Sequence, residues 1–186
     1  AIVRRQGLLC AGIKKLRLDD TMELADHVVR AIMEYEPDAV FVDAIGIGAG
    51  VIDRLRQLGH QIIPVKASEK PNRMGFFNLR ANMWADMRDW LRSGAHLPPD
   101  EDLEKQLISQ EYGMSANDLI QLVGKKEMKN QGLESPDIAD ALSFTFAYPV
   151  TIEDVVSSFR RIIDNKPEWD AVRIASRSWD PIRSKN

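Results

Sequence analysis

The chain has 186 residues and a mass of 21.0 kDa, with 44% apolar residues, 28% charged residues and a formal net charge of −3. This balance is typical of a globular domain and excludes an intrinsically disordered chain. The negative charge excludes tight nucleic-acid binding through bulk positive charge, so any DNA contact must be local. Cys10 is the only cysteine, which excludes a disulfide framework and fits a reducing, cytoplasmic compartment.

The chain begins with a predicted β-hairpin followed by a helix. Residues 1–6 and 8–18 are rich in Val, Ile and Leu and are separated by a glycine, which predicts two paired strands. Asp20 or Thr21 can cap a helix that runs to about Tyr35, because the apolar residues of this segment recur at helical spacing.

A βαβ unit is predicted next. Residues 39–42 form a short apolar run suited to a buried strand, and Asp43 stands at its carboxyl end. A short helix over 50–59 and a strand over 61–65 follow. This alternation favours a sheet that is at least partly parallel.

The second half is predicted to be mainly helical. After the polar loop 66–75 comes a long helix, then a helix over 100–113 and a strand over 118–124. Residues 125–134 are basic and predict an irregular connection. In the long helix the following residues recur at helical spacing and predict a core stripe: Met83, Met87, Trp90 and Leu91.

Two carboxylates open the last predicted helix. Ser135 is a good N-cap and Pro136 suits the first helical position, so Asp137 and Asp140 fall in the first turn. The helix dipole favours negative charge there, and that alone is a sufficient structural explanation.

Asp43 adds a third carboxylate with a different origin. It leaves a buried strand at the carboxyl edge of the sheet, where open α/β sheets bind ligands. Mg²⁺ and Mn²⁺ take oxygen ligands and need only a few protein carboxylates. Asp43 with Asp137 and Asp140 therefore predicts a site for two divalent cations of the kind that cleave phosphodiesters.

The glycine-rich segment 46–50, "GIGAG", follows the Asp43 strand. Its spacing differs from the dinucleotide-binding pattern G-x-G-x-x-G, and no P-loop lysine follows. The glycines more simply permit a tight turn and a close backbone approach beside Asp43.

Basic residues gather in two groups that could contact phosphates next to such a metal site. The alternative is that they are ordinary solvated surface residues. The two groups are Lys66, Lys70, Arg73 and Arg80, and Lys125, Lys126 and Lys129.

Three stretches in this order resemble the C-terminal nuclease domain of the large terminase subunit of tailed bacteriophages and prophages. They are "FVDAIGIGAGVIDRLRQLG", "FNLRANMWADMRDWLRSGAHLPPDEDLEKQL" and "KKEMKNQGLESPDIADALSFTFA". The resemblance implies an α/β, RNase H-like fold with a central mixed β-sheet flanked by helices. It also implies a two-metal endonuclease, using Mg²⁺ or Mn²⁺, that cuts concatemeric viral DNA during genome packaging.

The resemblance further implies partners and boundaries. Expected partners are double-stranded DNA, the terminase ATPase domain, the small terminase subunit and the portal protein, in the cytoplasm of the bacterial host and without a membrane. Residues 1–149 would be the nuclease domain and residues 150–186 a partly ordered C-terminal extension. Asp43 and Asp137 match catalytic metal ligands of the family, and Asp140 matches a further acidic position.

One departure from the family pattern bears on activity. The family places its first catalytic aspartate on a strand that would precede Ala1, so the domain is expected to be N-terminally truncated and this chain to cleave DNA poorly or not at all. Two other functions stay open: an RNase H-like junction resolvase or recombinase nuclease, and a noncatalytic DNA-clamping module.

Overall fold

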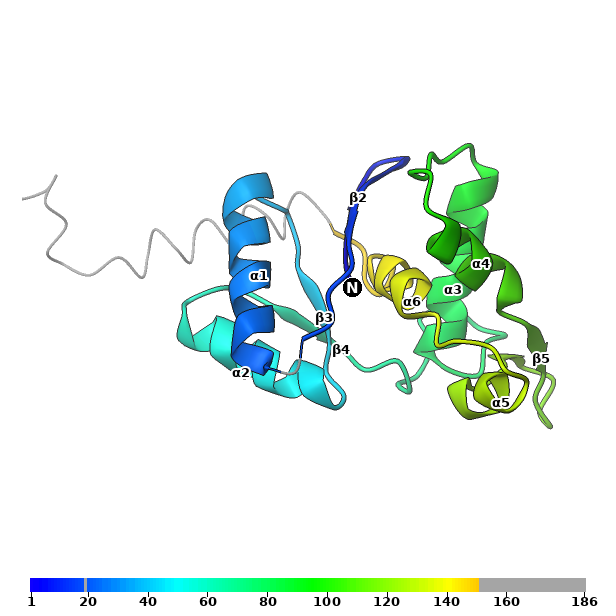
Figure 1. Cartoon of the computed structure of the whole chain (residues 1–186). Helices are drawn as coiled ribbons and strands as arrows, with labels where there is room; N and C mark the ends of the chain where they lie inside the picture. The colour runs from blue at the N-terminus through cyan, green and yellow to red at the C-terminus, as the bar shows by residue number, and fades with distance from the viewer. Residues whose placement is uncertain (19, 151–186) are drawn as a thin grey trace, which may run out of the picture. The chain divides into compact units, whose positions relative to one another are not determined.

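The computed structural model describes residues 1–18 and 20–150. By its backbone contacts the chain divides into two units, Ala1–Pro149 and Val150–Asn186, and the predicted extension lies almost wholly outside the described residues. The first unit contains both strands and helices, mixed along the chain (Figure 1). In chain order they are β1 (Ile2–Gln6), β2 (Leu9–Lys14), α1 (Thr21–Tyr35), β3 (Phe41–Asp43), α2 (Ile47–Gln57), β4 (Ile63–Val65), α3 (Leu79–Arg92), α4 (Glu101–Ser109), β5 (Tyr112–Met114), β6 (Ile120–Leu122), α5 (Lys125–Asn130) and α6 (Asp137–Phe144).

The predicted N-terminal hairpin is confirmed. Strands β1 and β2 pair antiparallel from Ile2 opposite Lys14, with an irregularity in register after Arg4. Gly7 closes the turn with a φ of 54°, a backbone conformation that costs glycine little.

The predicted βαβ unit is also confirmed. Strands β3 and β4 pair parallel, with Phe41 opposite Ile63, and α2 connects them. Helix α1 begins at the predicted cap, because the Asp20 side chain accepts a hydrogen bond from the Met22 N–H. Helices α1 and α2 pack together around a shared apolar cluster that contains Ala25, Val51, Ile52, Leu55 and Ile62.

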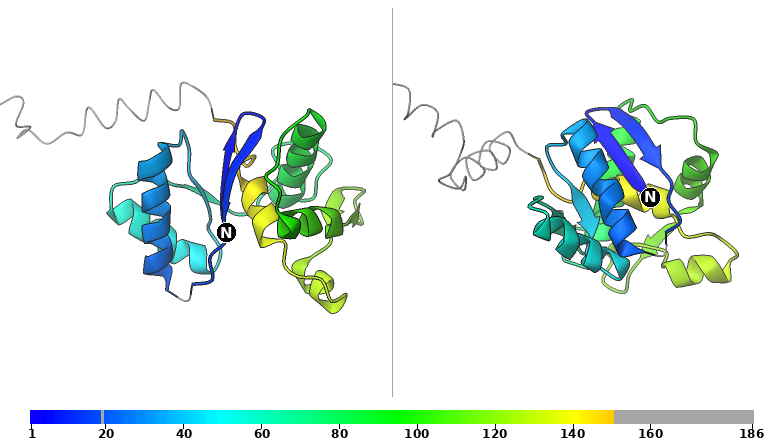
Figure 2. Two further views of the ribbon diagram at one scale, coloured as in Figure 1. Left: turned by 45° about the horizontal axis from the view of Figure 1, so that its top comes forward. Right: turned by 60° about the vertical axis from the view of Figure 1, so that its left-hand side comes forward.

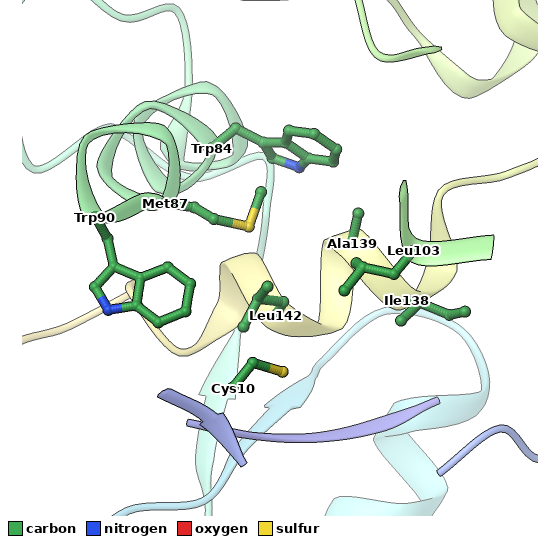
Figure 3. Close-up of a cluster of buried hydrophobic side chains, with 8 residues drawn as sticks. All are labelled: Cys10, Trp84, Met87, Trp90, Leu103, Ile138, Ala139 and Leu142. Atoms are coloured by element: carbon green, nitrogen blue, oxygen red, sulfur yellow. The ribbon is translucent and has the colours of Figure 1, made fainter. Parts of the chain in front are cut away.

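A second core lies between α3, α4, α6 and the hairpin. The predicted stripe of α3 faces inward, with Met83, Met87 and Trp90 buried and Leu91 half-buried. Figure 3 shows side chains from all these elements converging on α6. The buried members of this cluster are Cys10, Trp84, Met87, Trp90, Leu103, Ile138, Ala139 and Leu142.

The α/β class is confirmed, but a single central sheet is not seen. Among residues 1–18 and 20–150 the strands form three separate pairs, β1–β2, β3–β4 and β5–β6. Strands β3 and β4 are only three residues long and each pairs along one edge. Side-chain packing joins the pairs instead, since α6 contacts both β1 and β3, and the hairpin lies beside α6 in both views of Figure 2.

Two predicted segments differ in detail. The helix predicted over 100–113 ends at Ser109, because the next residues form β5, which pairs with β6 from Tyr112 opposite Leu122. The connection predicted over 125–134 contains a short helix, α5, which the buried side chain of Met128 fixes to the rest of the unit.

Candidate functional site

The two carboxylates predicted to open the last helix do so, and we call residues 137–140 of α6 the acidic turn. The predicted cap is wrong. Pro136 occupies the cap position, and the Ser135 hydroxyl donates to Asp137 Oδ1 at 2.7 Å instead of capping a backbone N–H. Because a proline side chain accepts no hydrogen bond, α6 has no cap from its own sequence.

Gln106 of α4 supplies the missing cap. Its side-chain oxygen accepts hydrogen bonds from the backbone N–H groups of Ile138 at 2.8 Å and Ala139 at 3.1 Å. No local pattern in the sequence indicates this cap, because Gln106 lies more than 30 positions before the helix it caps.

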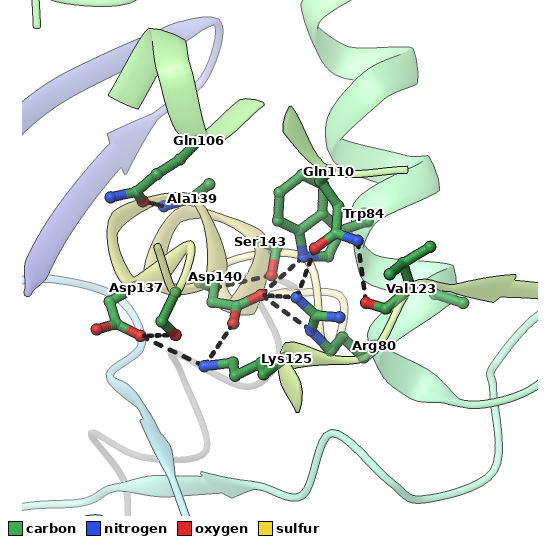
Figure 4. A network of polar contacts seen from close by, with 12 residues as sticks. Arg80, Trp84, Gln106, Gln110, Val123, Lys125, Asp137, Ala139, Asp140 and Ser143 are labelled. Carbon is green, nitrogen blue, oxygen red and sulfur yellow. Dashed lines mark hydrogen bonds and ion pairs between the residues drawn. The ribbon is translucent and has the colours of Figure 1, made fainter. Parts of the chain in front are cut away.

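Asp140 is buried and anchored. Its Oδ1 accepts hydrogen bonds from Arg80 Nε at 3.0 Å and from Trp84 Nε1 at 2.9 Å (Figure 4). Only 9% of the Asp140 side chain and 14% of the Arg80 side chain are exposed. Arg80 also donates to Gln110, just after α4, at 3.0 Å, so the guanidinium is held from two sides.

Lys125 joins the two carboxylates of the acidic turn. Its Nζ lies 2.9 Å from Asp140 Oδ2 and 3.3 Å from Asp137 Oδ1. Burial lowers the pKa of Lys125, but attraction to the two carboxylates outweighs this effect, so its pKa lies above the ordinary value. Asp137, by contrast with Asp140, keeps 67% of its side chain exposed. Asp137 and Asp140 therefore share Lys125 as an ion-pair partner.

Asp43 lies at the carboxyl end of β3, as predicted. Its Oδ1 accepts a hydrogen bond from the Ile45 N–H at 3.0 Å, and the residue is half-buried. The predicted close backbone approach is confirmed at Gly48, where an added Cβ would lie 1.7 Å from the Asp43 carbonyl oxygen. Gly46 begins the turn with a φ of 66°. Glycines thus fix the backbone around this aspartate.

Strand β3, which carries Asp43, contacts α6, the helix that begins with the acidic turn. Within residues 1–18 and 20–150, however, no group of three or more His, Cys, Asp or Glu side chains is arranged to hold a metal ion. The metal role of Asp43, Asp137 and Asp140 therefore stays a prediction.

The seven basic residues predicted to contact DNA fall into two classes. Four are paired with carboxylates: Arg80 and Lys125 with the acidic turn, Lys66 with Glu69, and Arg73 with Asp86 and Asp89. The other three are exposed and form no ion pair with any residue in the described part of the chain: Lys70, Lys126 and Lys129.

Solved structures share this arrangement of elements. The nuclease domain of the large terminase subunit of bacterial virus Sf6, as a point mutant with manganese, aligns with a TM-score of 0.66 and 24% identity over 79% of this chain and 82% of that chain. The chain has the fold of a phage terminase nuclease domain. The resemblance identified from the sequence is thereby confirmed.

Two further structures of the Sf6 terminase nuclease domain give the same result. The unmutated domain aligns with a TM-score of 0.65 and 25% identity, and a point mutant with calcium aligns with a TM-score of 0.65 and 24% identity. Each alignment covers 79% of this chain and 81% of the other. No protein-family model matches the sequence, and a search of curated proteins finds no match. None of the helices described in residues 1–18 and 20–150 is long and apolar enough to span a bilayer.

Proposed function

We propose that this chain is the metal-dependent DNA endonuclease domain of a phage large terminase subunit and cuts concatemeric viral DNA during genome packaging. The observation that carries the proposal is the placement of two carboxylates, Asp137 and Asp140, in the first turn of α6. They lie in a fold whose solved relatives include a manganese-containing terminase nuclease domain. Because a fold alone does not establish a function, the acidic turn is what connects this fold to metal-dependent cleavage.

The proposal includes an RNase H-like architecture for residues 1–149 and an extension over 150–186. It also includes the partners that the resemblance implies: double-stranded DNA, the terminase ATPase domain, the small terminase subunit and the portal protein, in the host cytoplasm. The similarity to terminase domains over 79% of the chain supports this set of proposals.

The donor atoms suit a hard divalent cation. Asp43 and Asp137 offer carboxylate oxygens that are at least partly exposed, and such oxygens are the ligands that Mg²⁺ and Mn²⁺ prefer. A pair of such ions, when bound, activates a water molecule and stabilises the leaving oxygen of the phosphodiester. We assign Asp43 and Asp137 as the residues that hold the cations.

The other side chains position this site. Asp140 would act as a further ligand or an orienting group, because Arg80 and Trp84 already bind its Oδ1 and fix the carboxylate in place. Lys125 and Arg80 together balance the two negative charges of the acidic turn when no metal is bound. Lys70, Lys126 and Lys129, which form no ion pair in the described part of the chain, would contact the DNA backbone.

Mn²⁺-dependent nicking of supercoiled plasmid tests the proposal. The assay uses the full-length protein, because the family resemblance implies one acidic ligand more than the three aspartates named here. We expect Asp43→Ala and Asp137→Ala each to reduce nicking by at least about 100-fold, because a metal site that loses a carboxylate ligand binds its ion poorly. Asp53→Ala, which changes an exposed aspartate of α2, is the control and should nick like the wild type. Full activity of both site variants would refute the proposal.

A noncatalytic DNA clamp is the second candidate. The ion pairs of Asp137 and Asp140 with Lys125 and of Asp140 with Arg80 favour it, because they balance the two negative charges and a clamp needs no bound metal. Calorimetric titration with Mn²⁺ distinguishes the two functions. A nuclease domain should bind Mn²⁺ and lose this binding on Asp137→Ala. A clamp should release no heat of Mn²⁺ binding, and it should bind DNA equally well with and without EDTA.

A further inference from the structure

We infer that Gln106 is a positioning residue of the proposed metal site, which it serves by capping α6 and fixing the acidic turn from the neighbouring helix α4. The inference rests on the proposed function, because it assumes that the acidic turn binds a metal. Gln106 itself has no role in the predictions made from the sequence.

The need for an outside cap comes from the sequence at the start of α6. The first N–H groups of a helix lack partners within the helix. The Asp137 N–H bonds the Ser135 carbonyl oxygen at 2.8 Å and the Asp140 N–H bonds the Pro136 carbonyl oxygen at 2.7 Å. The N–H groups of Ile138 and Ala139 remain between them, and both residues are buried, so water is a poor substitute partner.

Gln106 satisfies both groups with one atom. Its Oε1 lies 2.8 Å from the Ile138 nitrogen and 3.1 Å from the Ala139 nitrogen, as Figure 4 shows for Ala139. Only the oxygen of an amide can accept these bonds, so the orientation of the Gln106 amide is determined and its NH₂ group faces away from the backbone of α6.

The chemistry of an amide suits this position. A carboxylate would also accept the two bonds, but it would add a third negative charge beside Asp137 and Asp140. A neutral amide caps the helix without adding charge, so the charge balance between the two aspartates and Lys125 is unchanged.

A second glutamine, at the end of helix α4, is linked to the acidic turn through Arg80. Gln110 lies four positions after Gln106 and directly follows the last residue of α4. It accepts a hydrogen bond from Arg80, and Arg80 in turn binds Asp140. Gln106 therefore holds the backbone of the acidic turn, and Gln110 holds Arg80, the partner of Asp140. A shift of α4 would move both glutamines and so disturb both contacts.

Substitution of Gln106 tests the inference. Gln106→Met keeps the length of the side chain and removes the acceptor, whereas Gln106→Glu keeps an oxygen acceptor. We expect Gln106→Met to weaken Mn²⁺ binding by about tenfold, because the backbone that carries Asp137 loses its support, and loss of such indirect support around a metal site typically costs tenfold or more. It should also speed amide hydrogen exchange at Ile138 and Ala139, whereas Gln106→Glu should restore the protection of these amides.

Controls separate positioning from general damage to the fold. Gln57→Met changes an exposed glutamine at the end of α2 and should match the wild type in both measurements. Mn²⁺ titrations are made at a temperature where circular dichroism shows every variant fully folded. Wild-type Mn²⁺ affinity in Gln106→Met would overturn the role of Gln106 while leaving the proposed function intact. Absence of Mn²⁺ binding in the wild type would overturn the metal site, and the positioning role with it.

Discussion

Asp137 and Asp140 occupy one helical turn but have different surroundings. The Asp140 side chain is 9% exposed and bonded to Arg80, Trp84 and Lys125, whereas the Asp137 side chain is 67% exposed. A buried charge is stable only with its partners, and an exposed one is free to change partner. We therefore expect Asp140 to contribute mainly to folding, and we propose that Asp137 contributes mainly to ligand binding.

Alanine substitutions should separate these contributions. Asp140→Ala leaves the Arg80 guanidinium buried without its counter-charge, so we expect the free energy of unfolding to fall by about 3 kcal/mol. Asp137→Ala removes an exposed group, so we expect a change within about 0.5 kcal/mol together with loss of Mn²⁺ binding. Urea denaturation and Mn²⁺ calorimetry measure the two effects. Equal destabilisation by both substitutions would contradict the assignment.

Single residues could be predicted from the sequence only where the signal was local. The spacing of Asp137 and Asp140, and the place of Asp43 at a strand end, could be predicted because each depends on a few adjacent residues. The partners of Asp140 could not, since Arg80 lies 60 residues and Trp84 lies 56 residues before it. Such pairings depend on how helices pack, which no local pattern encodes.

At the scale of the elements, the turn between β3 and α2 has the least room for change. Gly48 sits against the Asp43 carbonyl group, while Gly50 has ordinary contacts of 3.7 Å and more with Thr21. The backbone that presents Asp43 thus depends on Gly46, for its positive φ, and on Gly48, for its close approach, but not on Gly50.

Two glycine substitutions should therefore differ. Gly48→Ala places a methyl group within bonding distance of the Asp43 carbonyl oxygen, so the turn must move, and we expect a loss of about 2 kcal/mol in the free energy of unfolding. Gly50→Ala, the matched control inside the same helix, should be neutral or stabilise by up to about 1 kcal/mol. Thermal denaturation checks both, and a neutral Gly48→Ala would show that the turn is not tightly held.

Helices and strands could be predicted from the sequence where their apolar repeat was long enough to recognise. The long apolar stripes of α1 and α3 and the hairpin strands repeat often enough to identify them. The six residues of α5 bury only Met128, and β5 has three exposed residues, so neither carries a repeat that could be recognised. The start of α6 was misplaced because its cap comes from another helix.

At the scale of the whole molecule, charge limits how DNA can bind. The chain carries a net charge of −3, and four of the seven predicted contact residues are already paired with carboxylates. Of these seven, Lys70, Lys126 and Lys129 are exposed and form no ion pair with any residue in the described part of the chain. Their few charges should give weak binding with a shallow salt dependence, because the slope grows with the number of phosphates neutralised.

Replacing these three lysines with glutamine measures their contribution. If each neutralises one phosphate, the slope of log K against log salt for duplex DNA should become less steep by about 2.7, because each phosphate contributes about 0.9 to the slope. Lys105→Gln, which changes an exposed lysine of α4 paired with Glu101, is the control and should leave the slope unchanged. Fluorescence anisotropy over a salt series measures the slopes, and an unchanged slope in the triple variant would exclude these lysines as phosphate-binding residues.

The long separation between Arg80 and its partner Asp140 also has a consequence for synthesis on the ribosome. Arg80, Trp84 and Gln106 leave the exit tunnel long before residues 137–140, because a nascent chain emerges from its N-terminus onward. Until residues 137–140 emerge, Arg80 and Trp84 lack Asp140, the carboxylate that they bind in the folded domain. An unfinished chain that lacks residues 137–140 therefore cannot contain an organised acidic turn, so the proposed metal site can form only late in synthesis.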